Sequence, residues 1–260
     1  MDFINSFQSE WLKKKRSLAS WLVIVGAFFT PSIILMSRIK NSGKLSALYV
    51  APDFWTKLWN QTWESMAAFL LPVGIILAVS LITQIEYKNN TWKQVHATPQ
   101  GFMTIFSAKF LVIVVMLTEV FVLLNVGIYL SAVIPAMLFS NLPYPAAPVP
   151  YLFFLKANIN YFLDCLPILA LQYLLSLQFR NFLVPIATGF AIWFLGVGML
   201  SWEFSYLFPY LHSTIDFLIS SGQFGKRKVP PLNIQLLAVI YFSLFTIVSY
   251  ILYVNKKEKA

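Results

Sequence analysis

The sequence predicts an all-α integral membrane protein with about six transmembrane helices. Of its 260 residues, 58% are hydrophobic and only 11% are charged, whereas soluble domains carry about 25% charged residues. Six apolar runs come close to the roughly 20 residues that a helix needs to cross a bilayer. The sequence has no strand-like alternation over segments of about ten residues, the pattern of outer-membrane barrels. Because backbone groups in lipid must bond internally, the apolar runs are expected to be helices.

The whole chain, residues 1–260, is expected to form one transmembrane domain. Its expected spans are Leu18–Met36, Ser65–Ile85, Phe110–Ile134, Ile159–Leu177, Phe182–Leu200 and Ile234–Val254. The first run follows a basic cluster, as the apolar part of a signal peptide would. At about 19 residues it is longer than that part usually is, and no small-x-small cleavage site closes it. We therefore expect it to remain in the protein as a span.

The segment 1–16 has the pattern of a short amphipathic helix. Four apolar residues fall on one helical face, namely Phe3, Ile4, Phe7 and Trp11. Basic residues follow at positions 13–16, where they can reach anionic lipid headgroups. We expect this helix to lie on the membrane surface. The alternative is a frayed polar tail.

The net charge of +9 does not indicate nucleic-acid binding, because the Lys and Arg residues lie mostly in short loops between apolar runs. That distribution is typical of membrane topology and of contact with anionic lipid. Basic residues are somewhat more numerous on the side that holds both termini, and the basic blocks beside the first and last spans lie there. The positive-inside rule then places both termini in the cytoplasm.

Three longer outer connections differ in character. Residues 38–62 are polar and aromatic, and Trp55 and Trp59 are expected at the membrane interface. The prolines of residues 142–151 favour an extended, stiff chain. Residues 201–233 carry an apolar stripe and are expected to form short helices that dip into the membrane, where protein must cover their backbone.

The sequence shows no catalytic or metal-binding pattern. Its fragment nearest to a phosphate-binding loop, Gly225-Lys226, lacks the required spacing. The two histidines, His96 and His212, are expected on opposite sides of the membrane, where they cannot share a metal ion. The single cysteine, Cys165, excludes an internal disulfide and is expected to pack in a span. Any chemistry that powers this protein must therefore come from another chain.

Two acidic residues lie within the expected spans, Glu119 in the third and Asp164 in the fourth. A carboxylate at bilayer depth costs roughly 2.5–3.5 kcal/mol on insertion scales, so each must be protonated, paired or in contact with water. One interpretation is a proton or substrate path. The other is a packing role through hydrogen bonds to neighbouring polar side chains. The candidate neighbours are Asn125, Asn160 and Gln172.

The connection between the second and third spans, residues 86–99, is the most informative segment. It is polar, and Trp92, Val95 and His96 would share one face of a two-turn helix. Pro99 would separate that helix from the next span. The alternative is a plain solvated loop, although such a loop rarely needs a tryptophan.

The same segment carries a family resemblance. The residues concerned are Glu86, Thr91, Trp92, Lys93, Thr98, Pro99, Ala108 and Lys109. They resemble the type-2 permeases of bacterial ATP-binding-cassette exporters, in which a glutamate ends the second span and a coupling helix, a proline and an Ala-Lys pair follow. The amphipathic start, the six spans and the long last outer loop are similar too. Asn90 departs from the family pattern, which often has glycine there.

The resemblance implies a permease subunit that pairs with a second permease chain, as a homo- or heterodimer, in the bacterial inner membrane. A separate cytoplasmic ATPase would bind ATP and Mg, so that this chain is not itself an enzyme. The substrate would be amphipathic or hydrophobic, such as a drug or an antimicrobial peptide, since the chain is similar in size to lantibiotic-immunity permeases. The residues expected to contact the ATPase are Glu86, Thr91, Trp92, Lys93, Val95, His96, Pro99, Arg180 and Asn181.

Two other functions remain open. A proton-coupled carrier would use Glu119 and Asp164 as a relay, and its transport would survive ATP depletion. A membrane scaffold or sensor without transport would assemble independently of any substrate. An intramembrane enzyme is less favoured, because no catalytic cluster converges at one depth.

Overall fold

The computed structural model describes residues 2–15, 17–88, 100–225 and 230–256. In chain order its elements are α1 (Asp2–Lys15), α2 (Leu18–Lys40), η1 (Ser42–Lys44), α3 (Ser46–Val50), α4 (Phe54–Ser65), η2 (Met66–Leu70), α5 (Leu71–Thr83), α6 (Ile85–Lys88), α8 (Phe102–Leu138), α9 (Tyr151–Gln178), α10 (Leu183–Gly198), η3 (Ser205–Leu207), η4 (Pro209–Leu211), α11 (His212–Ser220) and α12 (Ile234–Val254). These described residues form helices and connections without a strand. The all-α fold class is therefore confirmed.

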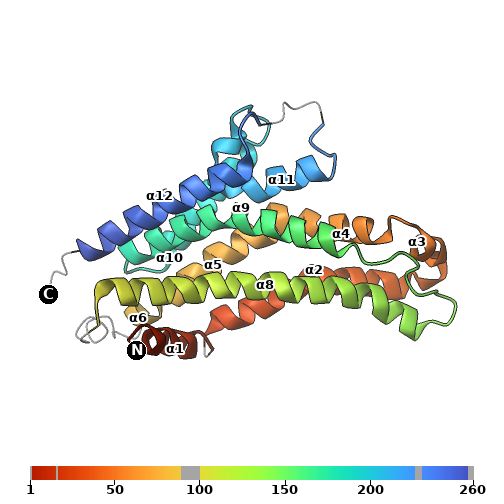
Figure 1. Ribbon diagram of the computed structural model, residues 1–260, viewed down its shortest axis with the longest axis horizontal. Helices are drawn as coiled ribbons and strands as arrows, with labels where there is room; N and C mark the ends of the chain where they lie inside the picture. Colours follow the sequence, from red (N-terminus) through yellow and green to blue (C-terminus); the bar gives the residue numbers. More distant parts are fainter. Residues whose placement is uncertain (1, 16, 89–99, 226–229, 257–260) are drawn as a thin grey trace.

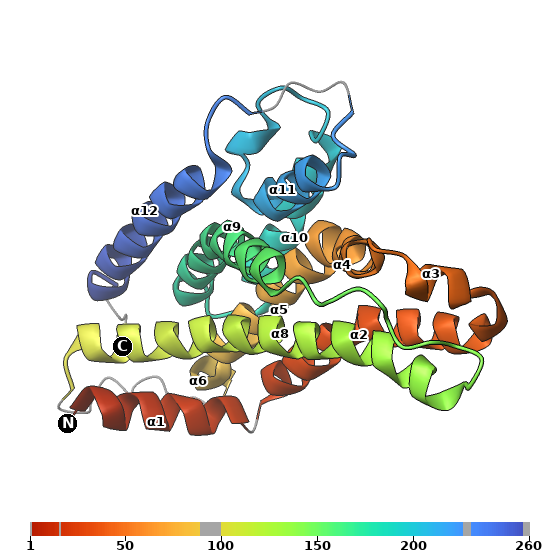
Figure 2. The same cartoon turned by 45° about the vertical axis from the view of Figure 1, so that its right-hand side comes forward.

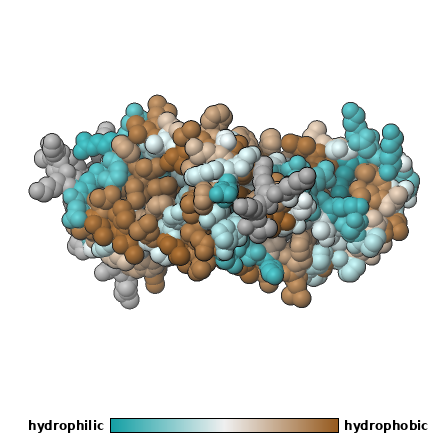
Figure 3. Space-filling model, turned by 90° about the horizontal axis from the view of Figure 1, so that it is seen from above, coloured by the Kyte–Doolittle hydropathy of each residue, from teal (hydrophilic) through white to brown (hydrophobic). Residues whose placement is uncertain are grey.

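The long helices run along the longest axis of the molecule, and both chain termini lie at one end of it (Figure 1). We call this the proximal end, and the opposite end, which holds α3, the distal end. Figure 2 shows α1 beside the first half of α8, while α12 lies on the other side of the bundle. Hydrophobic residues cover large areas of the face shown in Figure 3, and hydrophilic residues gather toward its two ends. This distribution suits a bundle that crosses a membrane along its long axis.

Five described helical segments are long and apolar enough to span a membrane: α2, Phe54–Tyr87, α8, α9 and α12. The predicted sixth span, Ile234–Val254, coincides with α12. The predicted fifth span is covered by α10, but that helix has only 16 residues, fewer than the roughly 20 that a perpendicular crossing needs. The end of α10 packs closely against η4. A Cβ atom at Gly196 would lie only 3.2 Å from Leu211 Cγ in η4.

The predicted outer connection is shorter than the expected residues 38–62, and its tryptophans are buried within the protein. The first span extends to Lys40, and α4 begins at Phe54. Trp55 and Trp59 are 3% and 2% exposed, so both belong to the core. Trp55 Nε1 donates a hydrogen bond to Ala147 O at 2.8 Å. This oxygen belongs to the proline-rich connection, which is non-helical as predicted and covers α4 at the distal end.

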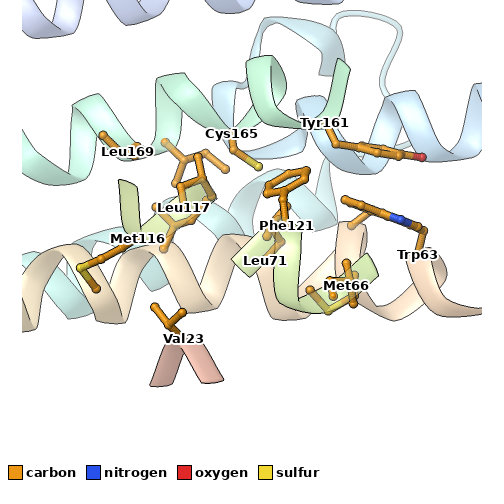
Figure 4. Packing of buried hydrophobic residues seen from close by; sticks show 14 of the residues in the cluster. Val23, Trp63, Met66, Leu71, Met116, Leu117, Phe121, Tyr161, Cys165 and Leu169 are labelled. Atoms are coloured by element: carbon orange, nitrogen blue, oxygen red, sulfur yellow. The ribbon is translucent and has the colours of Figure 1, made fainter. Parts of the chain in front are cut away.

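Aromatic stacking joins α4, α8 and α9 in the core. Trp63 stacks on Tyr161 with ring centroids 4.0 Å apart and an interplanar angle of 12°. Phe121 lies against Trp63 at 5.6 Å. Figure 4 shows these rings beside Cys165, which is fully buried as expected of a packing residue. Such aromatic pairs typically contribute about 0.5–1.5 kcal/mol beyond area burial.

A π-helical turn, η2, divides the second span between α4 and α5. It precedes Pro72, which has no N–H to donate to the carbonyl of Ala68. Trp193 Nε1 of α10 donates to that carbonyl instead, at 3.2 Å. The adjacent Ala67 O accepts from Ser213 Oγ at 3.0 Å and from Thr214 Oγ1 at 3.1 Å. The predicted short helices of residues 201–233 thus include one, α11, that completes the hydrogen bonding of the second span.

Gly189 of α10 is required by close packing against Gln172. A Cβ atom at Gly189 would lie 2.6 Å from Gln172 Oε1 and 2.9 Å from Ile76 Cγ2. Gly189→Ala is therefore expected to destabilise the protein by about 1–3 kcal/mol, measured as a lower thermal unfolding midpoint in detergent. Gly198→Ala is the matched control, because no atom lies within 4 Å of a Cβ there. Equal midpoints for the two variants would contradict this account of the packing.

Candidate functional site

The proximal end brings together segments that are far apart in the sequence. Gln84, between α5 and α6, donates from Nε2 to Ser176 O at 2.9 Å and to Phe179 O at 2.6 Å. Tyr87 OH lies 3.4 Å from Leu177 O. These bonds tie the end of the second span to the end of α9. The segment that leads into residues 89–99 therefore sits beside the turn after α9.

A cluster of four charged residues near this contact, which we call the charge cluster, joins α1, α6 and α8. Lys109 Nζ donates to Glu86 Oε1 at 2.8 Å and to Glu10 Oε2 at 2.9 Å. Lys13 Nζ donates to Glu86 Oε1 at 2.7 Å and also pairs with Glu10. Glu86 and Lys109 are 1% and 2% exposed. Because two carboxylates face two ammonium groups, the cluster is balanced in charge.

The polar face of α1 points toward α8. Ser6, Glu10 and Lys14 are buried and follow one another at four-residue spacing. Ser6 Oγ donates to Gln100 Oε1 at 2.5 Å, and Lys14 pairs with Glu119 of α8 at 2.6 Å. The predicted amphipathic helix is confirmed as a helix over Asp2–Lys15. On its apolar side Phe3 and Ile4 are exposed, as suits contact with lipid.

Lys256, at the end of α12, is attached to the same assembly. Its Nζ donates to Tyr87 OH at 2.8 Å and to Leu177 O at 2.6 Å. The ammonium also lies 5.1 Å from the centroid of the Tyr87 ring. The residue after the last span is thereby bonded to α6 and to the end of α9. These two elements lead into the two segments that are predicted to contact the ATPase.

A groove of about 790 Å³ opens between these elements, lined by residues such as Lys13, Gln84, Tyr87, Arg180 and Asn181. Arg180 and Asn181, two of the predicted contact residues, are exposed. Asn181 Oδ1 also accepts a hydrogen bond from the backbone N–H of Leu183 at 3.0 Å and so caps the first turn of α10. The polar part of the groove thus includes basic and amide groups, which suit docking of a polar protein surface.

The predicted contact residues have different surroundings. Glu86 is buried in the charge cluster, so the structure gives it a role within this chain as a link to α1 and α8. The residues of the connecting loop lie outside the described part of the chain, namely Thr91, Trp92, Lys93, Val95, His96 and Pro99. Their contact with an ATPase stays a prediction.

The polar residues expected in the spans have separate surroundings in the structure. Asn125 and Asn158 exchange side-chain hydrogen bonds at 2.9 and 3.1 Å. Gln172 Nε2 donates to Ser80 Oγ and to Pro185 O, both at 2.8 Å. The remaining members have other surroundings: Glu119 pairs with Lys14, Asp164 meets Gln235 of α12 at 3.4 Å, and Asn160 is half-buried on α9. The neighbours expected for Glu119 were wrong, because its partner is a lysine of α1.

The Lys14–Glu119 pair leads to a test of the proposed polar path. Glu119→Gln keeps the size of the side chain and can still accept a hydrogen bond from Lys14. Because the Glu119 side chain is 30% exposed, the loss in stability should not exceed about 1 kcal/mol, and transport should persist. The measurements are the thermal unfolding midpoint and ATP-driven transport. Lost transport at normal expression would instead assign Glu119 to a proton or substrate path.

Sequence reasoning missed several residues of this site. Lys109 entered only as part of a family motif, and Glu10 was assigned no role at all. The four-residue spacing of Ser6, Glu10 and Lys14 was the available signal for a polar contact face on α1. No local pattern shows that Lys256 reaches Tyr87, because this contact depends on how the last span packs.

Comparison with known proteins agrees with this arrangement. The family described as ABC-2 family transporter protein matches residues 6–196, which is more than half of the chain. The match includes α1 from residue 6 onward, the charge cluster and the groove residues Arg180 and Asn181. No curated protein gives a significant match. Together with five helices that can span a membrane, the match shows that the chain belongs to the ABC-2 family of transporters and is a multi-pass membrane permease of that family.

Proposed function

We propose that this permease exports an amphipathic or hydrophobic substrate, such as a drug or an antimicrobial peptide, using ATP hydrolysed by a separate subunit. Membership of the ABC-2 family implies an ATP-binding-cassette ATPase as the partner. That ATPase would bind ATP and Mg, since this chain has no phosphate-binding loop in its sequence. The proximal end would face the cytoplasm of a bacterial cell, with both termini on that side.

One observation carries the proposal: the described residues that flank the predicted docking loop lie beside the predicted docking turn at the proximal end. Residues 89–99 begin after α6, whose Tyr87 contacts Leu177 O, and they end before Gln100, which bonds to Ser6. Arg180 and Asn181 are exposed on the neighbouring turn. A single ATPase surface could therefore engage the loop and the turn together.

The charge cluster suggests how movement would pass into the bundle. A force on residues 89–99 would reach Glu86 through Tyr87 and Lys88, and the Glu86 carboxylate is bonded to Lys13 of α1 and Lys109 of α8. The three helices would then move as one body, while Lys256 transmits the displacement to α12. The ATPase would thus bias a two-state rearrangement of the spans. A second permease chain would complete the transporter, as a homo- or heterodimer.

An apolar pocket supports the choice of a hydrophobic substrate. A cavity of about 50 Å³ lies between α2, α5, α8 and α9 and is lined only by apolar residues, including Leu22, Met116 and Leu169. Two glycines, Gly26 and Gly74, contribute to the wall. A cavity of this size and lining suits a small alkyl group rather than a charged one.

The proposal is tested by transport in proteoliposomes that contain the permease and its copurified ATPase. We expect uptake of a fluorescent amphipathic peptide or dye to require ATP and to stop when the ATPase carries a substitution of its phosphate-binding lysine. A protonophore should leave uptake unchanged. Uptake that ignores ATP and collapses with the proton gradient would favour the proton-coupled carrier instead.

A further inference from the structure

A buried arginine lies at the distal end without a carboxylate partner among the described residues. Arg38, in the last turn of α2, is 6% exposed. The Cζ atom of its guanidinium lies 4.9 Å from the ring centroid of Phe54 and 5.5 Å from that of Tyr49. The carboxylate of Asp53, which precedes Phe54 in the chain, pairs with Lys57 at 2.8 Å instead. The described part of the chain therefore places no carboxylate in contact with this cation.

The guanidinium also uses few of its hydrogen-bond donors. Arg38 Nη1 donates to Tyr49 OH at 3.4 Å, which is a long hydrogen bond. Tyr49 OH donates in turn to Ala132 O of α8 at 2.9 Å. The other two nitrogens of Arg38, Nε and Nη2, donate to no described residue and are not enclosed, so they reach the molecular surface. Because a guanidinium has five N–H donors, most of them remain available to a ligand.

A cation in this environment lacks much of what water would supply. Burying a charge is costly unless the charge is paired and hydrogen-bonded. The two aromatic rings offset part of that cost through cation–π attraction, and the C-terminal end of α2 adds only a partial negative charge. Neither contribution gives Nε or Nη2 of Arg38 an acceptor. An anion with several oxygen atoms would supply both the missing charge and the missing acceptors.

The surroundings of Arg38 place it at the level of lipid headgroups. Met36 and Ile39, on the same helix, are exposed and apolar, as suits contact with acyl chains. Lys40 and Lys44, which follow them, are exposed and basic. The surface thus changes from apolar to basic near Arg38, where α2 leads into α3 at the distal end (Figure 2). Anionic phosphates of a bilayer lie at such a boundary.

We propose that Arg38 binds a phosphate group, supplied by the headgroup of a membrane phospholipid at the distal end. The planar fork of a guanidinium donates two parallel hydrogen bonds to phosphate oxygens, and Nε and Nη2 are free to form this fork. A phosphate ion in solution offers the same oxygens, but the exposed apolar residues beside Arg38 favour the lipid. Because Tyr49 belongs to α3 and Phe54 begins α4, the bound lipid fastens both elements to the end of α2.

Titration of the purified full chain in a neutral detergent tests this assignment. We expect phosphatidylglycerol to raise the thermal unfolding midpoint of wild type by at least about 2 °C. Diacylglycerol, which has no phosphate, and inorganic phosphate at the same concentration should not raise it. An equal rise with diacylglycerol would assign the effect to acyl chains alone, and an equal rise with inorganic phosphate would assign it to a soluble anion. Either of these results, or no rise with phosphatidylglycerol, would overturn the proposal whether or not the variants fold.

Two substitutions test whether Arg38 is the residue that binds the lipid. Arg38→Met removes the charge and the N–H donors and should weaken phosphatidylglycerol binding at least about tenfold, measured by native mass spectrometry. Lys40→Met is the matched control and should weaken binding less, because an exposed charge is screened by salt. The midpoint of each variant is compared with and without lipid, which separates lost binding from a general loss of stability. Equal affinities for the two variants would show that diffuse surface charge holds the lipid, which contradicts the proposal.

Discussion

Lys109→Met is expected to destabilise the permease by about 3–5 kcal/mol, the usual cost of removing one partner from a buried ion pair. Methionine fills much the same space, so the loss reflects charge rather than a cavity. Glu10 and Glu86 would be left with Lys13 as their only cation in the cluster. The measurement is the thermal unfolding midpoint of purified protein, together with its yield from membranes.

Two further variants test whether the lost charge balance of the cluster causes the loss of stability in Lys109→Met. Combining Lys109→Met with Glu86→Gln leaves Glu10 paired with Lys13 and should recover most of the loss, as in a double-mutant cycle. Lys57→Met removes an exposed pair with Asp53 at the distal end and should change stability little. If Lys109→Met were as stable as Lys57→Met, the cluster would not hold α1 and α6 to α8.

Trp92→Ala is expected to weaken assembly with the ATPase about thirtyfold. A tryptophan in a partner cleft typically contributes about 2 kcal/mol or more when truncated, and roughly 1.4 kcal/mol corresponds to a tenfold change in affinity. The measurement is the affinity of the purified ATPase for the permease in mild detergent. Folding should be unaffected, because Trp92 lies outside the expected membrane spans.

Lys93→Ala is the comparison for Trp92→Ala and should weaken assembly less, since charges at the rim of an interface act mainly on the association rate. The combined variant Trp92→Ala, Val95→Ala and His96→Ala should abolish substrate-stimulated ATP hydrolysis. If that triple variant keeps both the complex and the stimulation, residues 86–99 do not couple the ATPase to the permease.

The spans were predictable where an apolar run ends at polar capping residues. For α12, Asn233 precedes the run and accepts a hydrogen bond from Leu236 N at 3.1 Å, and Asn255 follows it. The helix α4 was missed because its exposed face is polar. Its buried tryptophans recur at four-residue spacing, as Trp55, Trp59 and Trp63, which is a helical pattern that average hydropathy does not detect.

The sequence predicted only those parts of the site that a local motif identifies, because the remaining contacts join residues far apart in the chain. Glu86 and Lys109 could be identified as significant from a local motif, but their pairing with α1 joins residues 73 and 99 positions apart. Such contacts depend on helix packing that single-sequence periodicity does not encode. The same holds for Gln235, whose hydrogen bond to Asp164 exists only after α12 packs against α9.

The central claim, that the proximal end docks a separate ATPase, is tested most directly by site-specific photo-crosslinking in intact membranes. A photoreactive residue would replace exposed Arg180 at the proximal end, and exposed Lys57 at the distal end would serve as the control. The account predicts that an ATP-binding-cassette ATPase, identified by mass spectrometry, is captured from position 180 and not from position 57. Capture from position 57, or from neither position in membranes where ATP-driven transport is active, would contradict it.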